Sequence, residues 1–173
     1  MKAPLLTQPP ESTPSYIAIA GHPIHPMLIT FPVAYLMAAL ASDLGYWWTA
    51  DPFWARASLW LTGGGLVMGL LAALAGALDF LLVREIRRHV TSWSHFLMAV
   101  MMLSIAGANW WLRLPDPEAG VMPWGIVLSA ATAFALSIAG WLGGKLVFEH
   151  KVGTGEDEEA EDEVETEVVV LER

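Results

Sequence analysis

Four long apolar stretches constrain this sequence more than any other feature. A helix needs about 20 residues to cross a hydrocarbon core of about 30 Å, because each residue adds about 1.5 Å. Stretches of that length lie at about 26–48, 57–83, 91–112 and 121–147. Pro52, Pro115 and Pro117 lie in the connections between these stretches and favour breaks in the helix there. Because the connections are short, neighbouring helices are expected to be antiparallel. The sequence therefore predicts an all-α fold, an integral membrane antiparallel four-helix bundle.

Composition supports a membrane protein and restricts its chemistry. Hydrophobic residues make up 55% of the 173 residues and charged residues only 16%, which a soluble domain of this size could not bury. No cysteine is present, so the sequence excludes disulfides, thiolate metal sites and iron–sulfur clusters within these residues. We find no nucleophile elbow, phosphate loop or nucleic-acid patch. We therefore predict no catalytic residue, and a binding or electron-transfer protein is favoured over an enzyme.

The two ends of the chain differ from its apolar body. Residues 1–17 are rich in proline and polar side chains and predict a disordered arm. Residues 153–173 form an acidic segment that holds ten of the eighteen Asp and Glu residues and predicts a disordered tail. The transmembrane domain is accordingly placed at residues 18–152.

Basic residues predict the orientation of the bundle. Most of them fall at one membrane boundary and few at the other, and the positive boundary faces the cytoplasm. Both termini are therefore predicted to be cytoplasmic. Tryptophans crowd the opposite boundary, where indole rings are favoured. The cytoplasmic set is Lys2, Arg84, Arg87, Arg88, Lys145 and Lys151; the opposite set is Arg56 and Arg113.

Polar residues inside the predicted helices gather at the two ends of one seam. Helical spacing places His25, Asp79, His95 and His150 on stripes that also carry small residues, so we expect these side chains to face the bundle interior at the cytoplasmic end. His22 lies beside them at the entry to the first helix. An ionised Asp79 within the hydrocarbon needs a partner, and His95 and His25 are candidates.

The other polar groups receive structural interpretations. At the opposite end, Asp43 and Arg113 are predicted to form an ion pair. A hydrogen-bonded pair of Asp79 and His95 that fixes helix packing is the structural alternative to a functional site. His89 lies in the basic connection and is the weakest candidate of the five histidines. No long-period repeat is evident.

The run from Gly21 to Pro32, Gly-His-Pro-Ile-His-Pro-Met-Leu-Ile-Thr-Phe-Pro, resembles the opening motif of a bacterial membrane family known as domain of unknown function 2231. Ala75–Asp79, His95 and Gly140–His150 resemble its later landmarks, so the resemblance covers about residues 18–154. Similar domains are joined to Rieske-type iron–sulfur domains, and their shape is similar to that of small four-helix cytochromes b. The resemblance implies a redox setting in the bacterial inner membrane.

Three functions fit these residues. The first is electron transfer by one b-type haem, whose axial ligands would be His22 or His25 on one side and His95 or His150 on the other. The second is binding of a zinc, iron, copper or manganese ion by the ligand set His22, His25, Asp79 and His95. The third is a non-catalytic subunit of a respiratory complex. Expected partners are the lipid bilayer and a separate respiratory or Rieske-type redox protein, with no nucleic acid; self-association into a homo-oligomer stays open.

Overall fold

The computed structural model describes residues 15–153 and confirms the predicted class of fold. Four segments in this part of the chain are helical, long and apolar enough to cross a membrane. Three are single helices, and the fourth is a helical run from Pro117 to Phe148 made of three pieces. The protein is therefore a multi-pass, all-α membrane bundle. The long helices are α1 (Ile24–Thr49), α2 (Pro52–Leu82), α4 (Val90–Arg113) and α6 (Ile126–Phe148).

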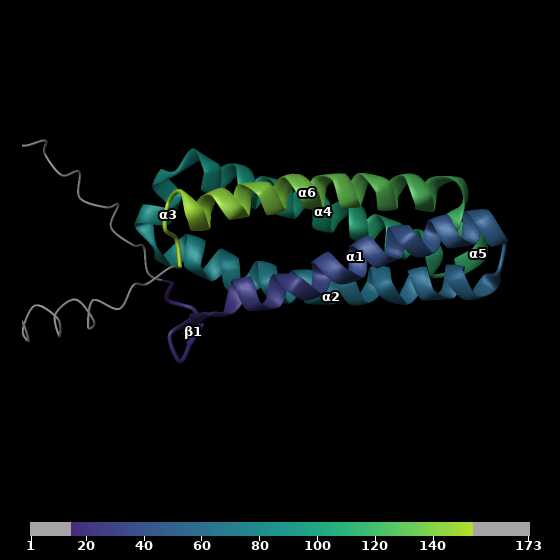
Figure 1. Ribbon diagram of the computed structural model, residues 1–173, viewed down its shortest axis with the longest axis horizontal. Coiled ribbons are helices and arrows are strands. Elements are labelled where there is room, and N and C mark those ends of the chain that lie inside the picture. Colours follow the sequence, from purple (N-terminus) through teal and green to yellow (C-terminus); the bar gives the residue numbers. More distant parts are fainter. Residues whose placement is uncertain (1–14, 154–173) are drawn as a thin grey trace, which may run out of the picture.

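The bundle consists of two helical hairpins packed side by side (Figure 1). Helix α1 makes its most extensive contacts with α2, and α4 makes its most extensive contacts with α6. Contacts between the hairpins run mainly from α2 to α4 and from α1 to α6. Each hairpin therefore presents one face to the other, and the polar seam lies between these faces.

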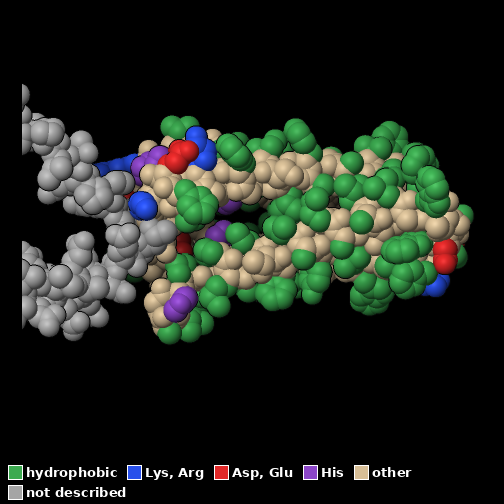
Figure 2. All heavy atoms as spheres, in the orientation of Figure 1, with side chains coloured by type: hydrophobic (Ala, Val, Ile, Leu, Met, Phe, Trp, Pro, Cys, Tyr) green, Lys and Arg blue, Asp and Glu red, His purple; other side chains and the backbone are tan. Residues whose placement is uncertain are grey.

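We name the two ends of the bundle by their characteristic residues. The tryptophan end contains the α1–α2 connection and the exposed indoles of Trp48, Trp60 and Trp111. The histidine end contains the starts of α1 and α4 and the short helix α3 (Arg84–Arg88). Apolar side chains cover the length of the visible face, and charged side chains gather toward the ends (Figure 2). This distribution suits a lipid environment around the middle of the bundle.

Helix α2 begins at Pro52, earlier than the residue 57 expected from apolarity alone. The Asp51 side chain accepts a hydrogen bond from the Phe53 amide at 2.9 Å, and Pro52 occupies the first helical turn. Aspartate before a helix and proline within its first turn both stabilise a helix start. Local capping therefore extends the helix beyond its apolar stretch.

The last membrane segment is interrupted near its start. Asp116 caps α5 (Pro117–Gly120) by accepting from the Glu118 and Ala119 amides, and a π-helical turn η1 (Val121–Gly125) follows. Within this turn Met122 has φ −112° and ψ 137°, which is not helical. Regular α-helix resumes in α6, so the predicted helix at 121–147 begins with a kink.

Both described chain ends pack at the histidine end. Strands β1 (Ala18–Ile19) and β2 (His22–Pro23) pair antiparallel just before α1. The segment after α6 runs toward α2 (Figure 1), where Val152 packs on Phe80, Val83 and Ile86. Residues 1–14 and 154–173, which hold most of the predicted arm and tail, lie outside the described residues.

Small residues allow the helices to approach closely. A Cβ atom on Gly69 would lie 2.7 Å from Leu103 Cδ2, and one on Gly65 would lie 2.8 Å from Leu36 Cγ. Such contacts drive association of transmembrane helices, because lipid removes the hydrophobic advantage of burial. The main apolar cluster consists of Leu36, Met102, Leu103, Ala106, Ala135 and Leu136.

Several inward-facing positions of the two hairpins correspond by a fixed sequence spacing, with one value for the first helices and another for the second helices. His25 and His95 are seventy positions apart, and so are Asp43 and Arg113. Leu36 and Ala106, both buried in the main cluster, keep the same spacing. In the second helix of each hairpin the spacing is sixty-seven, as in these two pairs: Ala72 and Ala139, and Gly76 and Gly143. The two hairpins thus place several inward-facing residues at corresponding positions, although their sequences differ too much to reveal a repeat.

Candidate functional site

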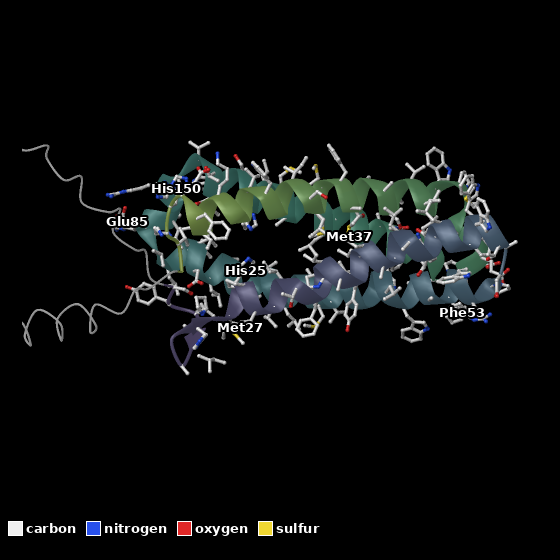
Figure 3. The ribbon with its side chains drawn as sticks, in the orientation of Figure 1. His25, Met27, Met37, Phe53, Glu85 and His150 are labelled. Carbon is white, nitrogen blue, oxygen red and sulfur yellow. The ribbon has the colours of Figure 1, made fainter. Side chains whose placement is uncertain are left out.

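His25 and His95 lie near each other between the two hairpins. Their ring centroids are 6.2 Å apart and the ring planes are perpendicular. His25 comes from the first turn of α1, and His95 comes from the second turn of α4. Figure 3 shows His25 projecting from α1 toward the second hairpin. The seam predicted from helical spacing therefore does bring these two imidazoles together.

Each imidazole is held by the second helix of its own hairpin. His25 Nδ1 lies 2.7 Å from the Ala72 carbonyl oxygen of α2, and His95 Nδ1 lies 2.9 Å from the Ala139 carbonyl oxygen of α6. A carbonyl oxygen only accepts, so Nδ1 must carry the proton in both rings. In the neutral imidazoles Nε2 is then the unprotonated nitrogen, which is the form that ligates metals.

Glycines make room for both rings. A Cβ atom on Gly76 would lie 2.8 Å from His25 Nδ1, and one on Gly143 would lie 3.2 Å from His95 Cε1. Figure 2 shows a hollow between the hairpins near this level, with histidine side chains on its wall. The two halves therefore supply matching sets of histidine, carbonyl acceptor and glycine.

Asp79 is buried but serves the start of the described chain and not the histidine pair. Its Oδ1 accepts from the amides of Tyr16 and Ile17 at 2.9 and 3.0 Å, and its Oδ2 accepts from Ser15 Oγ at 2.6 Å. Part of the predicted disordered arm thus binds α2. The contact expected between Asp79 and His95 is not formed, because the chain before α1 takes the carboxylate oxygens.

The remaining histidines lie apart from the pair. His22 is exposed, and its Nδ1 lies 2.8 Å from the Ala20 carbonyl oxygen. His150 lies beside His89, with ring centroids 4.2 Å apart, beyond the ends of the long helices. Among residues 15–153, no group of three or more His, Asp or Glu side chains is placed to hold a metal ion. The predicted ligand set of His22, His25, Asp79 and His95 is therefore not assembled in this structure.

The tryptophan end holds a second polar layer, and here the predicted ion pair is confirmed. Arg113 Nη1 lies 2.7 Å from Asp43 Oδ1, Nη2 lies 2.8 Å from Oδ2, and both side chains are fully buried. Ser58 and Ser129 donate to the carboxylate, while Asn109 accepts from Arg113 Nε. Each of the four long helices contributes to a layer whose donors and acceptors are satisfied, as buried charges require.

The site residues that the sequence did not identify contribute either a backbone carbonyl oxygen or the room left by a missing side chain. Ala72 and Ala139 contribute only carbonyl oxygens, and Gly143 contributes only the absence of a side chain. The sequence feature that could have identified them is the fixed number of positions between corresponding residues of the two hairpins. This correspondence becomes visible once the inward-facing positions are known.

Residues 21–156 match a family model described as a predicted membrane protein, DUF2231. The chain belongs to this family. Comparison with curated proteins and with solved structures gave no match. In this DUF2231 protein the matched region begins at the Gly-His-Pro step before α1 and includes both histidine halves and the buried ion pair.

Proposed function

We propose that this DUF2231 protein binds one b-type haem through His25 and His95 and transfers electrons. The observation that carries the proposal is the placement of the two imidazoles. They come from equivalent positions of the two hairpins, face the space between them and keep Nε2 available. Axial ligation by histidines from facing helices is a common haem arrangement in helical bundles.

The separation of the rings suits two ligands on opposite sides of one iron. An imidazole bound at a metal–nitrogen distance of about 2.1 Å has its ring centroid about 3.2 Å from the metal. Two such rings in trans are then about 6.4 Å apart. The observed separation is 6.2 Å. Four-coordinate binding of an ion would need two further ligands, and among residues 15–153 no group of three or more His, Asp or Glu side chains is placed to supply them.

Electron transfer fits this coordination better than binding or activation of a small molecule. His25 and His95 would hold the haem iron between them, and the hydrogen bonds to their rings would then influence its reduction potential. The carbonyl oxygens of Ala72 and Ala139 would fix both ring orientations. These 173 residues contain no cysteine, so they cannot themselves hold a cysteine-ligated iron–sulfur cluster.

Absorption spectra test the proposal directly. The protein is expressed with adequate haem supply and purified in detergent, and oxidised and reduced spectra are recorded with elemental analysis of the same sample. We expect a Soret band and a reduced α band with about one iron per chain, both lost in His25→Ala and His95→Ala. His22→Gln and His150→Gln are the matched controls and should keep the spectrum.

Two results would overturn the proposal. A well-folded, colourless and metal-free protein leaves only a structural role for the histidine pair. A stoichiometric metal without a Soret band favours a non-haem site instead. Melting curves of each variant separate loss of haem from loss of fold.

A further inference from the structure

The inward-facing residues of α1 and α6 lose their burial toward the histidine end. On α1, Leu36 is 2% exposed, whereas Ile29 is 37% exposed on the same stripe, about two helical turns nearer the histidine end. On α6, Leu136 is buried, and Gly140, about one turn further along its stripe, is exposed. A Cβ atom on Gly140 would meet no atom within 4 Å. The two helices therefore leave open space beside Gly140.

Helices α1 and α6 diverge along their length (Figure 1). Near the tryptophan end, Ser129 of α6 donates a hydrogen bond to Asp43 of α1 at 2.5 Å. Midway along the bundle, Leu36 and Leu136 belong to one buried cluster. Nearer the histidine end, the hollow with histidine side chains on its wall separates the hairpins (Figure 2). The hollow beside the histidine pair is therefore open between α1 and α6.

Packed side chains and chain ends cover this hollow on its other sides. Between α2 and α4, Phe80 stacks on Phe96 with ring centroids 5.3 Å apart, and Phe80 is buried. At the histidine end Val152 packs on Phe80. A Cβ atom on Gly153 would lie 3.4 Å from Pro23 Cγ, so the two described chain ends touch each other. Among residues 15–153, the side between α1 and α6 is therefore the accessible one.

The opening faces the hydrocarbon of the bilayer. Ile29 exposes an apolar side chain there, and both helices belong to segments long and apolar enough to cross a membrane. Gly144 also lies beside open space, since a Cβ atom on it would meet no atom within 4 Å. Lys145 is the one charged residue of α6, and it lies about 7 Å nearer the histidine end than Gly140. An apolar molecule in the membrane therefore meets no charged residue of α6 at the level of Gly140.

We infer that haem enters from the bilayer through the opening between α1 and α6, and that Gly140 keeps this route open. The inference rests on the proposed haem function and adds the route to the site. The porphyrin is a flat and largely apolar ring, which favours the membrane over water. Gly140 follows Ala139, whose carbonyl oxygen holds His95, so the opening leads to the histidine pair. The alternative is entry from water at the histidine end, past the chain that Asp79 binds.

Haem uptake in a bilayer tests the route. The full chain is produced in a haem-deficient host and reconstituted into phosphatidylcholine vesicles, and the growth of the Soret band is followed after haem is added. In Gly140→Trp the indole fills the opening, and the uptake rate should fall about tenfold or more. In Ile29→Ala the opening is wider, and the uptake rate should rise about threefold.

Three variants serve as controls and should keep the wild-type uptake rate. Gly140→Ala adds one methyl group, which would meet no atom within 4 Å. Ser137→Trp places the same indole on the exposed surface of α6, about one helical turn away. Asp79→Ala releases the chain end that covers the histidine end and leaves the opening between α1 and α6 unchanged. Melting curves identify any variant that fails to fold.

A wild-type uptake rate in Gly140→Trp would overturn this inference and leave the haem proposal intact. Faster uptake in Asp79→Ala would also overturn it, because haem would then enter at the histidine end. If Gly140→Trp binds no haem at all, Ile29→Ala decides, and a wild-type rate in that variant rejects the route. Absence of haem binding by the wild-type protein would end the proposed function itself.

Discussion

Asp43 and Arg113 form a two-point, fully buried ion pair between positions seventy residues apart, the same spacing that separates His25 and His95. The two halves of the bundle thus meet at two levels through equivalent residues. At the tryptophan end the equivalent positions carry opposite charges and neutralise each other. At the histidine end they carry identical imidazoles, each with its Nδ1 held by a backbone carbonyl oxygen of its own hairpin.

The buried ion pair should dominate the stability of the tryptophan end. Arg113→Ala leaves Asp43 buried without its counter-charge, and we expect a loss of about 3–5 kcal/mol in the free energy of unfolding. Unfolding in mixed detergent micelles measures the effect. The matched control is Arg88→Ala, which removes an exposed pair with Glu85 and should change stability by less than about 1 kcal/mol. Equal effects of the two substitutions would contradict the structure.

The glycines beside the histidine rings should be required for haem retention. In Gly76→Ala the new Cβ would lie 2.8 Å from His25 Nδ1, so the ring must move away from the Ala72 carbonyl oxygen. We expect the haem-to-protein ratio in purified protein to fall several-fold.

Gly140→Ala and Gly144→Ala provide the controls for this substitution. At both positions an added Cβ would meet no atom within 4 Å, so haem retention should equal that of the wild type. A similar loss in all three variants would show that the effect comes from helix conformation and not from contact with the ring.

Asp79 should hold the chain that precedes α1. Asp79→Ala removes the acceptor of the Tyr16 and Ile17 amides, and their hydrogen exchange should accelerate about tenfold or more. Asp116→Ala removes a helix cap at the tryptophan end and should leave these amides unchanged. Since Asp79 does not contact the histidine pair, Asp79→Ala should retain haem. Loss of haem in this variant would show that Asp79 takes part in the site.

The histidine end should face the cytoplasm. Arg113 is neutralised within the bundle, so Arg56 is the one Lys or Arg exposed at the tryptophan end among residues 15–153, which strengthens the charge asymmetry. The sequence has no cysteine, so single substitutions such as Glu85→Cys and Thr49→Cys can be labelled without background. In intact cells a membrane-impermeant thiol reagent should label Thr49→Cys alone. Labelling of Glu85→Cys alone would show that the bundle has the opposite orientation.

The membrane spans could be predicted from the sequence because the signal is local and the bilayer fixes its length. The limits of α1 and α4 differ from the predicted ones by one or two residues. The larger differences, at the start of α2 and before α6, arise where Asp51 and Asp116 cap helices outside the apolar stretch. Hydropathy does not register a cap, which depends on the backbone amides that follow it.

The candidate site was only partly readable from the sequence. Helical spacing placed His25, His95 and Asp79 on inward stripes, and Asp43 with Arg113 in one layer, because residues three and four apart share a helix face. Spacing alone did not determine which inward groups would meet. That choice depends on how far each helix is rotated and on where the chain ends pack.

The amino-acid sequence by itself determined that this chain crosses the membrane four times, with its charges paired or placed at the ends, since apolar length and charge cost in lipid leave few other solutions. The tertiary structure decided that His25 meets His95, that Asp79 binds the chain before α1, and that His150 lies beside His89. These outcomes depend on backbone acceptors such as Ala72 and Ala139, and a carbonyl oxygen is the same in every residue. Only the packing of the two hairpins tells which carbonyls hold the histidines.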